Sequence, residues 1–317
     1  MINAALSGID MQEAYAAILE EWNTSEVITF QTSGSTGTPK TIFFTKEQVK
    51  RSADRTAQFF YLKENAEVFC ALPPVYVAGK MMALRAIILN WNLTWQTPSA
   101  TPVIAKNYDF AAFTSQQVSH LLEASSETLN GIQHVLLGGG PLSENANMLL
   151  KTVTTEVWEG YGMTETLTHI ALRKVSEDGC FKSLKGVSLT LGSNQNLIIQ
   201  DNWLNLEAFD TNDLVEFVGE GFVVKGRLDN VIISGGVKIF PEEIEKRLSQ
   251  VIHQPFYISS KSDEVLGQKV VLYVEGDASN FQLEKINELN LGIRKPKEVF
   301  FKPKFNRTAS GKIIREL

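Results

Sequence analysis

The first half of the chain alternates short hydrophobic runs with longer segments in which apolar residues recur at helical spacing. Short runs rich in β-branched and aromatic residues indicate strands, and the longer periodic segments indicate helices. Strands that alternate with helices predict an α/β fold with a parallel sheet. The expected strands lie at 27–30, 41–44, 68–72, 92–97, 110–114, 134–137 and 155–158, and the expected helices at 10–22, 45–62, 77–89 and 115–124.

The pattern changes after about residue 170, where short apolar runs follow one another with turn residues between them. Runs at 189–191, 197–200, 214–218 and 222–224 predict an antiparallel β segment. From Asp229 onward, strands at 231–234, 269–274 and 298–302 and helices from Pro241 and at 281–290 predict a small α+β domain. We therefore expect an α/β protein. Its large N-terminal domain, with a parallel sheet and an antiparallel β segment, spans 1–228, and its small, mobile C-terminal domain spans 229–317.

Composition narrows the classes of function. A chain of 317 residues with 44% hydrophobic residues can build the large core that this fold needs. The net charge of −6 argues against nonspecific nucleic-acid binding, which requires a basic surface. The two cysteines form no C-x-x-C pair, so neither a disulfide framework nor a cysteine metal site is indicated. No signal peptide and no apolar run of membrane-spanning length is apparent, which favours a cytoplasmic protein without membrane insertion.

A loop rich in glycine and hydroxyl groups separates the first two expected strands. Its sequence from Thr32 to Lys40 is T-S-G-S-T-G-T-P-K, and we expect it to connect a hairpin. Glycines expose backbone N–H groups, which together with hydroxyls and a lysine can hold a polyphosphate. The P-loop of kinases is excluded, because Pro39 stands where that motif has glycine and no helix follows. A solvated polar loop remains the alternative when the segment is considered alone.

Further stretches carry candidate chemistry. Gly138 to Pro141 ends an expected strand, and a second such end is followed by Gly160 to Thr166. In the latter, Tyr161 offers a flat ring for a base, and Glu165 offers an oxygen ligand for Mg²⁺. The remaining candidates are Asp213, which can accept from ribose hydroxyls, Arg227 and Lys312. Each of them also has an ordinary structural explanation.

Taken in order, these segments resemble the adenylate-forming superfamily of acyl-CoA synthetases, luciferases and peptide-synthetase adenylation domains. That family's phosphate loop, T-S-G-[ST]-T-G-x-P-K, matches 32–40, and its Y-G-[MT]-T-E matches 161–165. Its G-R-x-D hinge and I-I-S-G-G segment match 226–229 and 232–236. Its P-R-T-x-x-G-K tail matches up to Lys312, with asparagine in place of the proline. Fewer residues precede the phosphate loop than in most members. We expect helix 10–22 or formation of a homodimer to cover the apolar face thus left open.

The resemblance implies ATP, Mg²⁺ and CoA as co-substrates or cofactors, and it implies a role for each matched residue. Thr164, Glu165 and Lys312 would be catalytic, with Thr164 on the α-phosphate, Glu165 as the Mg²⁺ ligand and Lys312 as the adenylation lysine. Asp229 would be the hinge, and Gly235 and Gly236 would contact CoA. The implied ATP-binding residues are Thr32, Ser33, Gly34, Ser35, Thr36, Gly37 and Lys40 for the phosphates, Gly138, Gly139, Gly140, Pro141, Gly160, Tyr161 and Gly162 around the adenine, and Asp213 and Arg227 for the ribose.

The acid substrate is indicated by two residues. Tyr76 lies in a segment that resembles the family's L-P-L-F-H-x-S-G, where most members have histidine. Arg85 lies in an otherwise apolar helix, where a charge is costly unless it is paired. It either reaches solvent or a structural acid at the helix edge, or it binds a second carboxylate of the substrate. The o-succinylbenzoate–CoA ligases of menaquinone biosynthesis are similar here, with a basic residue at the same spacing after this segment. We therefore expect o-succinylbenzoate as the acid.

Two other functions stay open. One is an enzyme that adenylates another aromatic or aliphatic acid and delivers it to CoA or to a carrier protein. The other is a homologue that binds nucleotide without catalysis. The joint presence of Lys40, Glu165 and Lys312 argues against the second, because all three charges serve turnover.

Overall fold

The computed structural model describes residues 10–32, 40–140, 142, 144–177, 179–307 and 313–315. The described chain forms two compact units, each considered by itself. The first contains residues up to Ser188 together with Gln200–Glu207. The second contains Leu189–Ile199 and the described residues from Ala208 onward. The proposed domain boundary at residue 228 remains a prediction.

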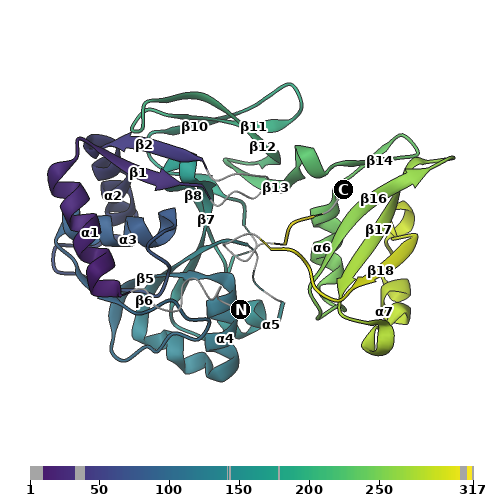
Figure 1. Ribbon diagram of the computed structural model, residues 1–317, viewed down its shortest axis with the longest axis horizontal. Coiled ribbons are helices and arrows are strands. Elements are labelled where there is room, and N and C mark those ends of the chain that lie inside the picture. Colours follow the sequence, from purple (N-terminus) through teal and green to yellow (C-terminus); the bar gives the residue numbers. More distant parts are fainter. Residues whose placement is uncertain are drawn as a thin grey trace. The chain divides into compact units, whose positions relative to one another are not determined.

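A seven-stranded sheet, in the order β4-β3-β5-β6-β7-β8-β9, forms the centre of the first unit (Figure 1). Strands β3 to β7 run parallel to one another, whereas β8 pairs antiparallel with β7 and β9 pairs antiparallel with β8. The predicted α/β class with a parallel sheet is confirmed. The strands are β3 (Glu67–Cys70), β4 (Asn92–Trp95), β5 (Tyr108–Thr114), β6 (Ile132–Gly138), β7 (Glu156–Met163), β8 (Thr168–Lys174) and β9 (Lys182–Ser183).

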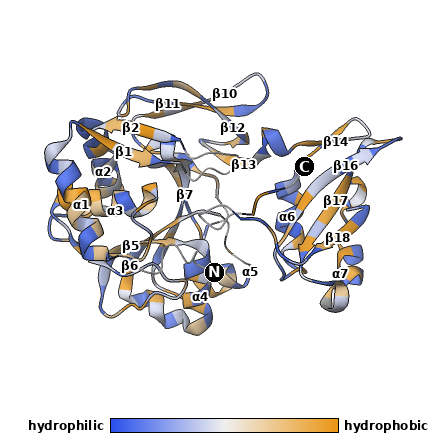
Figure 2. Cartoon of the chain, in the orientation of Figure 1, coloured by the Kyte–Doolittle hydropathy of each residue, from blue (hydrophilic) through white to orange (hydrophobic). Residues whose placement is uncertain are grey.

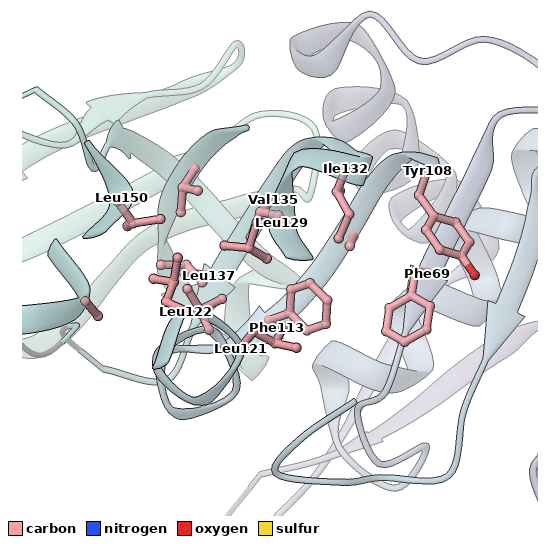
Figure 3. Packing of buried hydrophobic residues seen from close by; sticks show 14 of the residues in the cluster. Phe69, Tyr108, Phe113, Leu121, Leu122, Leu129, Ile132, Val135, Leu137 and Leu150 are labelled. Carbon is pink, nitrogen blue, oxygen red and sulfur yellow. The ribbon is translucent and has the colours of Figure 1, made fainter. Parts of the chain in front are cut away.

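Helices cover both faces of this sheet, because successive strand residues point to opposite sides. Phe69, Phe113 and Leu137 pack with α4 and α5, and Figure 3 shows this cluster. Their neighbours Val68 and Phe110 pack on the other face with α2 and α3. Burial of each such aromatic side chain contributes about 1.5–3 kcal/mol to stability. The helices are α2 (Lys46–Phe60), α3 (Val77–Leu89), α4 (Ser115–Ala124) and α5 (Glu144–Leu150).

A two-stranded hairpin and the first helix add a further layer. Strands β1 (Val27–Gln31) and β2 (Thr41–Thr45) pair antiparallel, which confirms the expected hairpin on either side of the phosphate loop. Helix α1 (Met11–Thr24) buries Ile18 in a cluster with β1 and α3. Hydrophilic and hydrophobic residues alternate along α1 in Figure 2, as expected of a helix with one buried face. Within the described residues, no helix is both long enough and apolar enough to cross a membrane.

The antiparallel β segment is also present. It is a four-stranded sheet in the order β10-β11-β12-β13, in which β12 and β13 pair antiparallel with a bulge at Leu214/Val215. A bulge bends a strand and allows a long strand to follow a curved sheet. The strands are β10 (Val187–Leu191), β11 (Asn196–Asp201), β12 (Leu206–Val218) and β13 (Gly221–Arg227).

The last part of the second unit is a five-stranded mixed sheet with two helices, as expected of the α+β domain. Helices α6 (Pro241–Leu248) and α7 (Leu283–Glu288) supply Ile244, Leu248 and Ile286 to the hydrophobic core of this sheet. Pro241 begins α6, where its fixed φ is favourable and no N–H is required. The strands are β14 (Ile232–Ser234), β15 (Val237–Ile239), β16 (Phe256–Asp263), β17 (Gly267–Glu275) and β18 (Glu298–Lys302).

The sequence analysis missed four strands and misplaced the ends of others, most of all the end of β7 and the start of β12. Strands β8, β9, β15 and β16 were not expected. Polar residues interrupt β8 and β16, and β9 and β15 are two and three residues long, which is too short for a periodic signal. The expectation that Gly160 follows a strand end was wrong, because β7 continues to Met163 and pairs with β8 there.

Candidate active site

Two glycine-containing segments meet at the carboxyl edge of the main sheet. Strands β6 and β7 are parallel neighbours, with Leu137 opposite Glu159, so Gly138, the last residue of β6, lies beside Gly160, which is inside β7. In open α/β sheets, ligands bind outside the carboxyl ends of the strands. The structure therefore brings together two of the segments that the sequence assigned to the nucleotide.

The backbone at Gly139 and Gly140 favours glycine. Gly139 and Gly140 have φ of +90° and +140°, which side chains other than hydrogen disfavour. A Cβ atom at Gly138, Gly139 or Gly140 would meet no described atom within 4 Å, so this turn faces open space. The Ser115 hydroxyl donates to the Gly140 carbonyl and fixes the turn against the start of α4. Such a turn can accept a flat ring against its backbone.

Gly160 and Gly162 allow β8 to lie close against β7. A Cβ atom on Gly162 would lie 1.8 Å from the Thr168 carbonyl oxygen, and one on Gly160 would lie 3.1 Å from the His169 Cβ. The first of these contacts is impossible without moving backbone. Gly160 and Gly162, on either side of Tyr161, therefore determine how closely residues 168 and 169 approach β7.

A short 3₁₀ turn, Thr164–Thr166, connects β7 to β8. The buried Thr166 hydroxyl is 2.8 Å from the Thr168 carbonyl and 3.0 Å from the Met163 N–H, and so closes the turn from inside. After it, Leu167 and Thr168 have φ of +49° and +86°. Positive φ is strained for a β-branched residue, and such strain concentrates at functional sites. Glu165, the expected Mg²⁺ ligand, is half-buried on this turn and has no ion-pair partner among the described residues.

Arg85 lies in the interior, contrary to the alternative that it reaches solvent from a helix edge. Its side chain is 1% exposed. Nη2 donates to the Thr168 hydroxyl at 2.8 Å, and Nη1 lies 3.9 Å from the Met82 sulfur. Nε has no hydrogen-bond partner among the described residues. Within the described part of the chain no carboxylate pairs with it, so the alternative of a structural acid is also not supported. Burial lowers the pKa of Arg85 to about 10, but the guanidinium stays charged at neutral pH.

Thr168 and His169 were not identified from the sequence. His169 is buried between Thr168 and Thr56, with its Nδ1 and Nε2 each 3.4 Å from a hydroxyl oxygen. Burial and the charges of Arg85 and Arg55 lower the pKa of His169 well below its usual value, so the ring is neutral. No sequence pattern marks these two residues as part of the site. Thr168 is 83 residues from Arg85 along the chain, so only the fold shows that the two side chains meet.

Tyr76 and Gly79 lie at the start of the helix that carries Arg85. Tyr76 is the half-buried residue preceding α3, and burial raises the pKa of its phenol. Gly79 has no room for a side chain, since a Cβ atom there would lie 2.1 Å from the Pro73 carbonyl oxygen. The close approach fixes the first turn of α3 on the 73–74 segment. Tyr76 is thus the N-cap residue of the helix that carries Arg85.

The phosphate loop is described only at its base. Thr32 and Lys40 exchange two hydrogen bonds, each of 2.9 Å, from the Thr32 N–H to the Lys40 carbonyl and from the Lys40 N–H to the Thr32 hydroxyl. These bonds close the hairpin. Ser33, Gly34, Ser35, Thr36, Gly37, Pro141 and Lys312 lie outside the described residues, so their assigned roles remain predictions.

The second unit brings together the two expected ribose ligands and the expected hinge. Asp213 and Arg227 face each other across β12 and β13, with 3.1 Å between Oδ1 and Nη1. Arg227 also bonds both carboxylate oxygens of Asp229, at 3.1 and 3.2 Å. Burial lowers the pKa of Arg227, but the bonds to Asp229 and the charge of Asp213 outweigh it and raise the pKa overall.

Gly235 and Gly236 form the two-residue turn between β14 and β15, with φ of +56° and +79°. A two-residue hairpin turn with both φ positive favours glycine strongly. The exposed residues Ile233 and Val237 stand on either side of this turn. Among the described residues, no cluster of three or more His, Cys, Asp or Glu side chains could hold a metal ion unaided.

Comparison with known proteins agrees with this arrangement. Residues 17–206 match the family described as AMP-binding enzyme. The 2-succinylbenzoate–CoA ligase of Listeria monocytogenes serotype 4b is 30% identical over 94% of this chain and 71% of that protein. The 2-succinylbenzoate–CoA ligase of Bacillus cytotoxicus is 27% identical over the same shares of the two chains.

Solved structures share the fold. An acyl-CoA synthetase (AMP-forming)/AMP-acid ligase II-like protein from Dyadobacter fermentans is 32% identical, with a TM-score of 0.64 over 95% of this chain and 91% of that one. The o-succinylbenzoate CoA synthetase of Bacillus subtilis, in complex with its acyl-adenylate intermediate, is 22% identical, with a TM-score of 0.81 over 90% of this chain and 67% of that one. The chain belongs to the AMP-binding enzyme family.

Proposed function

We propose that this protein is an AMP-forming acid–CoA ligase and that its acid is o-succinylbenzoate. The observation that carries the substrate is Arg85, a buried cation to which no described carboxylate is paired. The curated relatives named 2-succinylbenzoate–CoA ligase support the same acid. The glycine segments at the carboxyl edge of the sheet support nucleotide binding there.

The charge of Arg85 explains why a dicarboxylic acid suits the site. A buried charge without a partner is strongly unfavourable, whereas a carboxylate that pairs with it removes most of that cost. Nε has no hydrogen-bond partner within the described part of the chain, so it can donate to an additional acceptor. Arginine binds carboxylates through two parallel hydrogen bonds, which also fixes their orientation. One carboxylate of the substrate would pair with Arg85, and the other would remain free to react.

We assign the first chemical step to adenylation. A carboxylate oxygen of the acid attacks the α-phosphorus of ATP, the bond to the bridging oxygen breaks, and pyrophosphate leaves. Negative charge builds on the phosphoryl oxygens, which Thr164 and Lys312 would stabilise by donating hydrogen bonds. The loop 32–40 would hold the β- and γ-phosphates. Removal of one such group typically costs roughly 10²–10³ in rate.

Glu165 is suited to Mg²⁺ when the nucleotide is bound. Mg²⁺ typically takes one or two protein carboxylates and completes its shell with substrate phosphates and water. Glu165 offers one carboxylate with no ion-pair partner among the described residues, on the turn that also carries Thr164. The bound ion would neutralise charge on the phosphates.

The second step transfers the acyl group to CoA. The thiol sulfur attacks the acyl carbon of the adenylate, and AMP leaves with the electron pair of the broken mixed-anhydride bond. We assign Asp213 and Arg227 to the ribose, Tyr161 to the adenine, and Gly235 and Gly236 to the pantetheine. Rotation about Asp229 would withdraw Lys312 after adenylation.

Acid-dependent release of pyrophosphate tests this function. The acids are o-succinylbenzoate, benzoate and a fatty acid, each with and without CoA. We expect release with o-succinylbenzoate and a thioester once CoA is added. Release with another acid alone would keep the adenylation mechanism and reject the substrate. Absence of release with every acid, together with ATP binding, would favour a nucleotide-binding homologue without catalysis.

A further inference from the structure

The three elements that surround Arg85 also enclose His169. Arg85 comes from α3, Thr168 and His169 come from the start of β8, and Thr56 comes from α2. A line of hydrogen bonds connects them: Arg85 Nη2 to Thr168 Oγ1, Thr168 Oγ1 to His169 Nδ1, and His169 Nε2 to Thr56 Oγ1. The Thr56 hydroxyl in turn reaches the Ser52 carbonyl at 3.2 Å.

The direction of each bond follows from what each group can donate. The Thr56 hydroxyl gives its single proton to the Ser52 carbonyl, so it accepts from His169 Nε2–H. Nδ1 of a neutral ring is then an acceptor and receives the Thr168 hydroxyl proton. Arginine can only donate, so the Thr168 oxygen accepts from Arg85. Every donor in the line therefore points the same way, and the ring carries its proton on Nε2.

This order has a consequence for Arg85. Because the Thr168 proton is engaged by His169, the lone pairs of the Thr168 oxygen stay directed at the guanidinium. A doubly protonated His169 would lose this acceptor at Nδ1 and would add a cation beside Arg85. The charged or titratable groups facing the ring are Arg85 on α3 and Arg55 on α2, and both lower its pKa; Arg55 is itself paired with Asp201.

We propose that His169 is a positioning residue that, through Thr168, holds Arg85 in the orientation that receives the second carboxylate of the acid. The strained backbone of Thr168 supports this role, because its φ of +86° persists only where the surroundings impose it. His169 is buried, and its backbone pairs with Gly162 of the nucleotide segment, while both of its ring nitrogens bond within this line of hydrogen bonds. The proposal rests on the proposed function of Arg85.

Steady-state kinetics on matched variants test it, with pyrophosphate release measured for o-succinylbenzoate and for an analogue that lacks the non-reacting carboxylate. His169→Leu removes the acceptor for Thr168, whereas His169→Asn keeps an amide oxygen close to the position of Nδ1. We expect His169→Leu to raise KM for o-succinylbenzoate about tenfold, as for loss of a buried hydrogen bond. KM for ATP and kcat/KM for the analogue should stay within about twofold. His169→Asn should restore most of the loss, and His120→Asn, on α4, serves as the control.

A second pair of variants covers the case in which His169→Leu does not fold. Thr56→Val removes the acceptor that holds the proton on Nε2, and Thr56→Ser keeps it. We expect a raised KM for o-succinylbenzoate with Thr56→Val and a normal one with Thr56→Ser. Equal effects on both substrates, or a His169→Leu variant with the wild-type KM, would overturn the role of His169. If the wild-type protein does not use o-succinylbenzoate at all, the failure lies with the proposed function. If Arg85→Met changes KM and His169→Leu does not, only this inference fails.

Discussion

Arg55 and Asp201 form a bidentate ion pair in the interior of the first unit, with both N–O distances at 2.7 Å. The two side chains are 3% and 0% exposed. The Arg55 guanidinium also lies 5.0 Å from the centre of the Trp203 ring. Arg55 and Arg85 are both buried, at 3% and 1% exposed, but among the described residues only Arg55 has an acid beside it. Arg55 therefore shows, within the same protein, how a buried arginine is paired with a carboxylate, and Arg85 can be compared with it.

Breaking that pair should destabilise the protein severely. Asp201→Asn leaves the Arg55 charge buried without a counter-charge, and loss of one partner of a buried pair costs about 3–5 kcal/mol. Replacement of both residues by leucine should cost much less, because no charge remains buried. Denaturant unfolding of the two variants measures the difference. Equal losses in the single and double variants would contradict the interpretation.

Arg85→Met should affect stability and substrate use in opposite directions. Methionine fills a similar volume without a buried charge, so the melting temperature should rise or stay unchanged. KM for o-succinylbenzoate should increase by at least about tenfold, while KM for ATP stays the same. Calorimetry and pyrophosphate release measure the two effects on one preparation. A lower melting temperature with an unchanged KM would show that Arg85 has a structural role.

Gly162→Ala should displace Thr168 and so disturb the environment of Arg85. Its new methyl group would collide with the Thr168 carbonyl, where a Cβ atom would lie 1.8 Å away. Overpacking of this kind typically costs about 1–3 kcal/mol, and the displaced Thr168 should also raise KM for the acid. Gly179→Ala is the control, because its nearest contact would be an ordinary 3.7 Å. Similar unfolding midpoints for the two variants would refute this account.

Lys312→Ala should abolish adenylation without affecting folding. Loss of one group that stabilises transition-state charge costs roughly 10²–10³ in rate. The exposed Lys285 on α7 provides the control variant, Lys285→Ala, which should keep the wild-type rate. Exchange of labelled pyrophosphate into ATP isolates the first step. Normal exchange in Lys312→Ala would reject the assigned role.

The pKa of His169 predicts how stability varies with pH. Burial, together with Arg85 and Arg55, lowers this pKa below the unfolded value, so below about pH 6.5 the unfolded chain binds more protons than the folded one. Stability is therefore fully present above that pH and falls on acidification by up to about 1.4 kcal/mol per pH unit. His169→Asn should reduce this slope between pH 6.5 and 5. An unchanged slope would mean that other groups cause the acid sensitivity.

Residue patterns predicted most of the architecture. Buried parallel strands such as β5 and β6 are nearly continuous hydrophobic runs, and the capping box predicted by the T-x-x-Q spacing at α2 is present. The sequence pattern did not predict β8, because the buried His169 interrupts its run of apolar residues.

The environment of Arg85 was only partly foreseeable. Its position in an apolar helix indicated an unusual charge, but its partner depends on left-handed backbone at Leu167 and Thr168. No propensity scale predicts that conformation for leucine or threonine, since tertiary packing imposes it.

In the proposed function, the buried guanidinium of Arg85 would also determine which acids the protein rejects. A fatty acid, or any acid with a hydrocarbon end, would place apolar atoms next to a desolvated charge and leave that charge unpaired. A site with a buried polar group strongly rejects a ligand that lacks the matching polar group. A hydrophobic pocket discriminates far less between ligands of different length. If Arg85 binds the acid as proposed, selectivity at position 85 would act mostly by exclusion, and a relative that uses a monocarboxylic acid would be expected to lack this arginine.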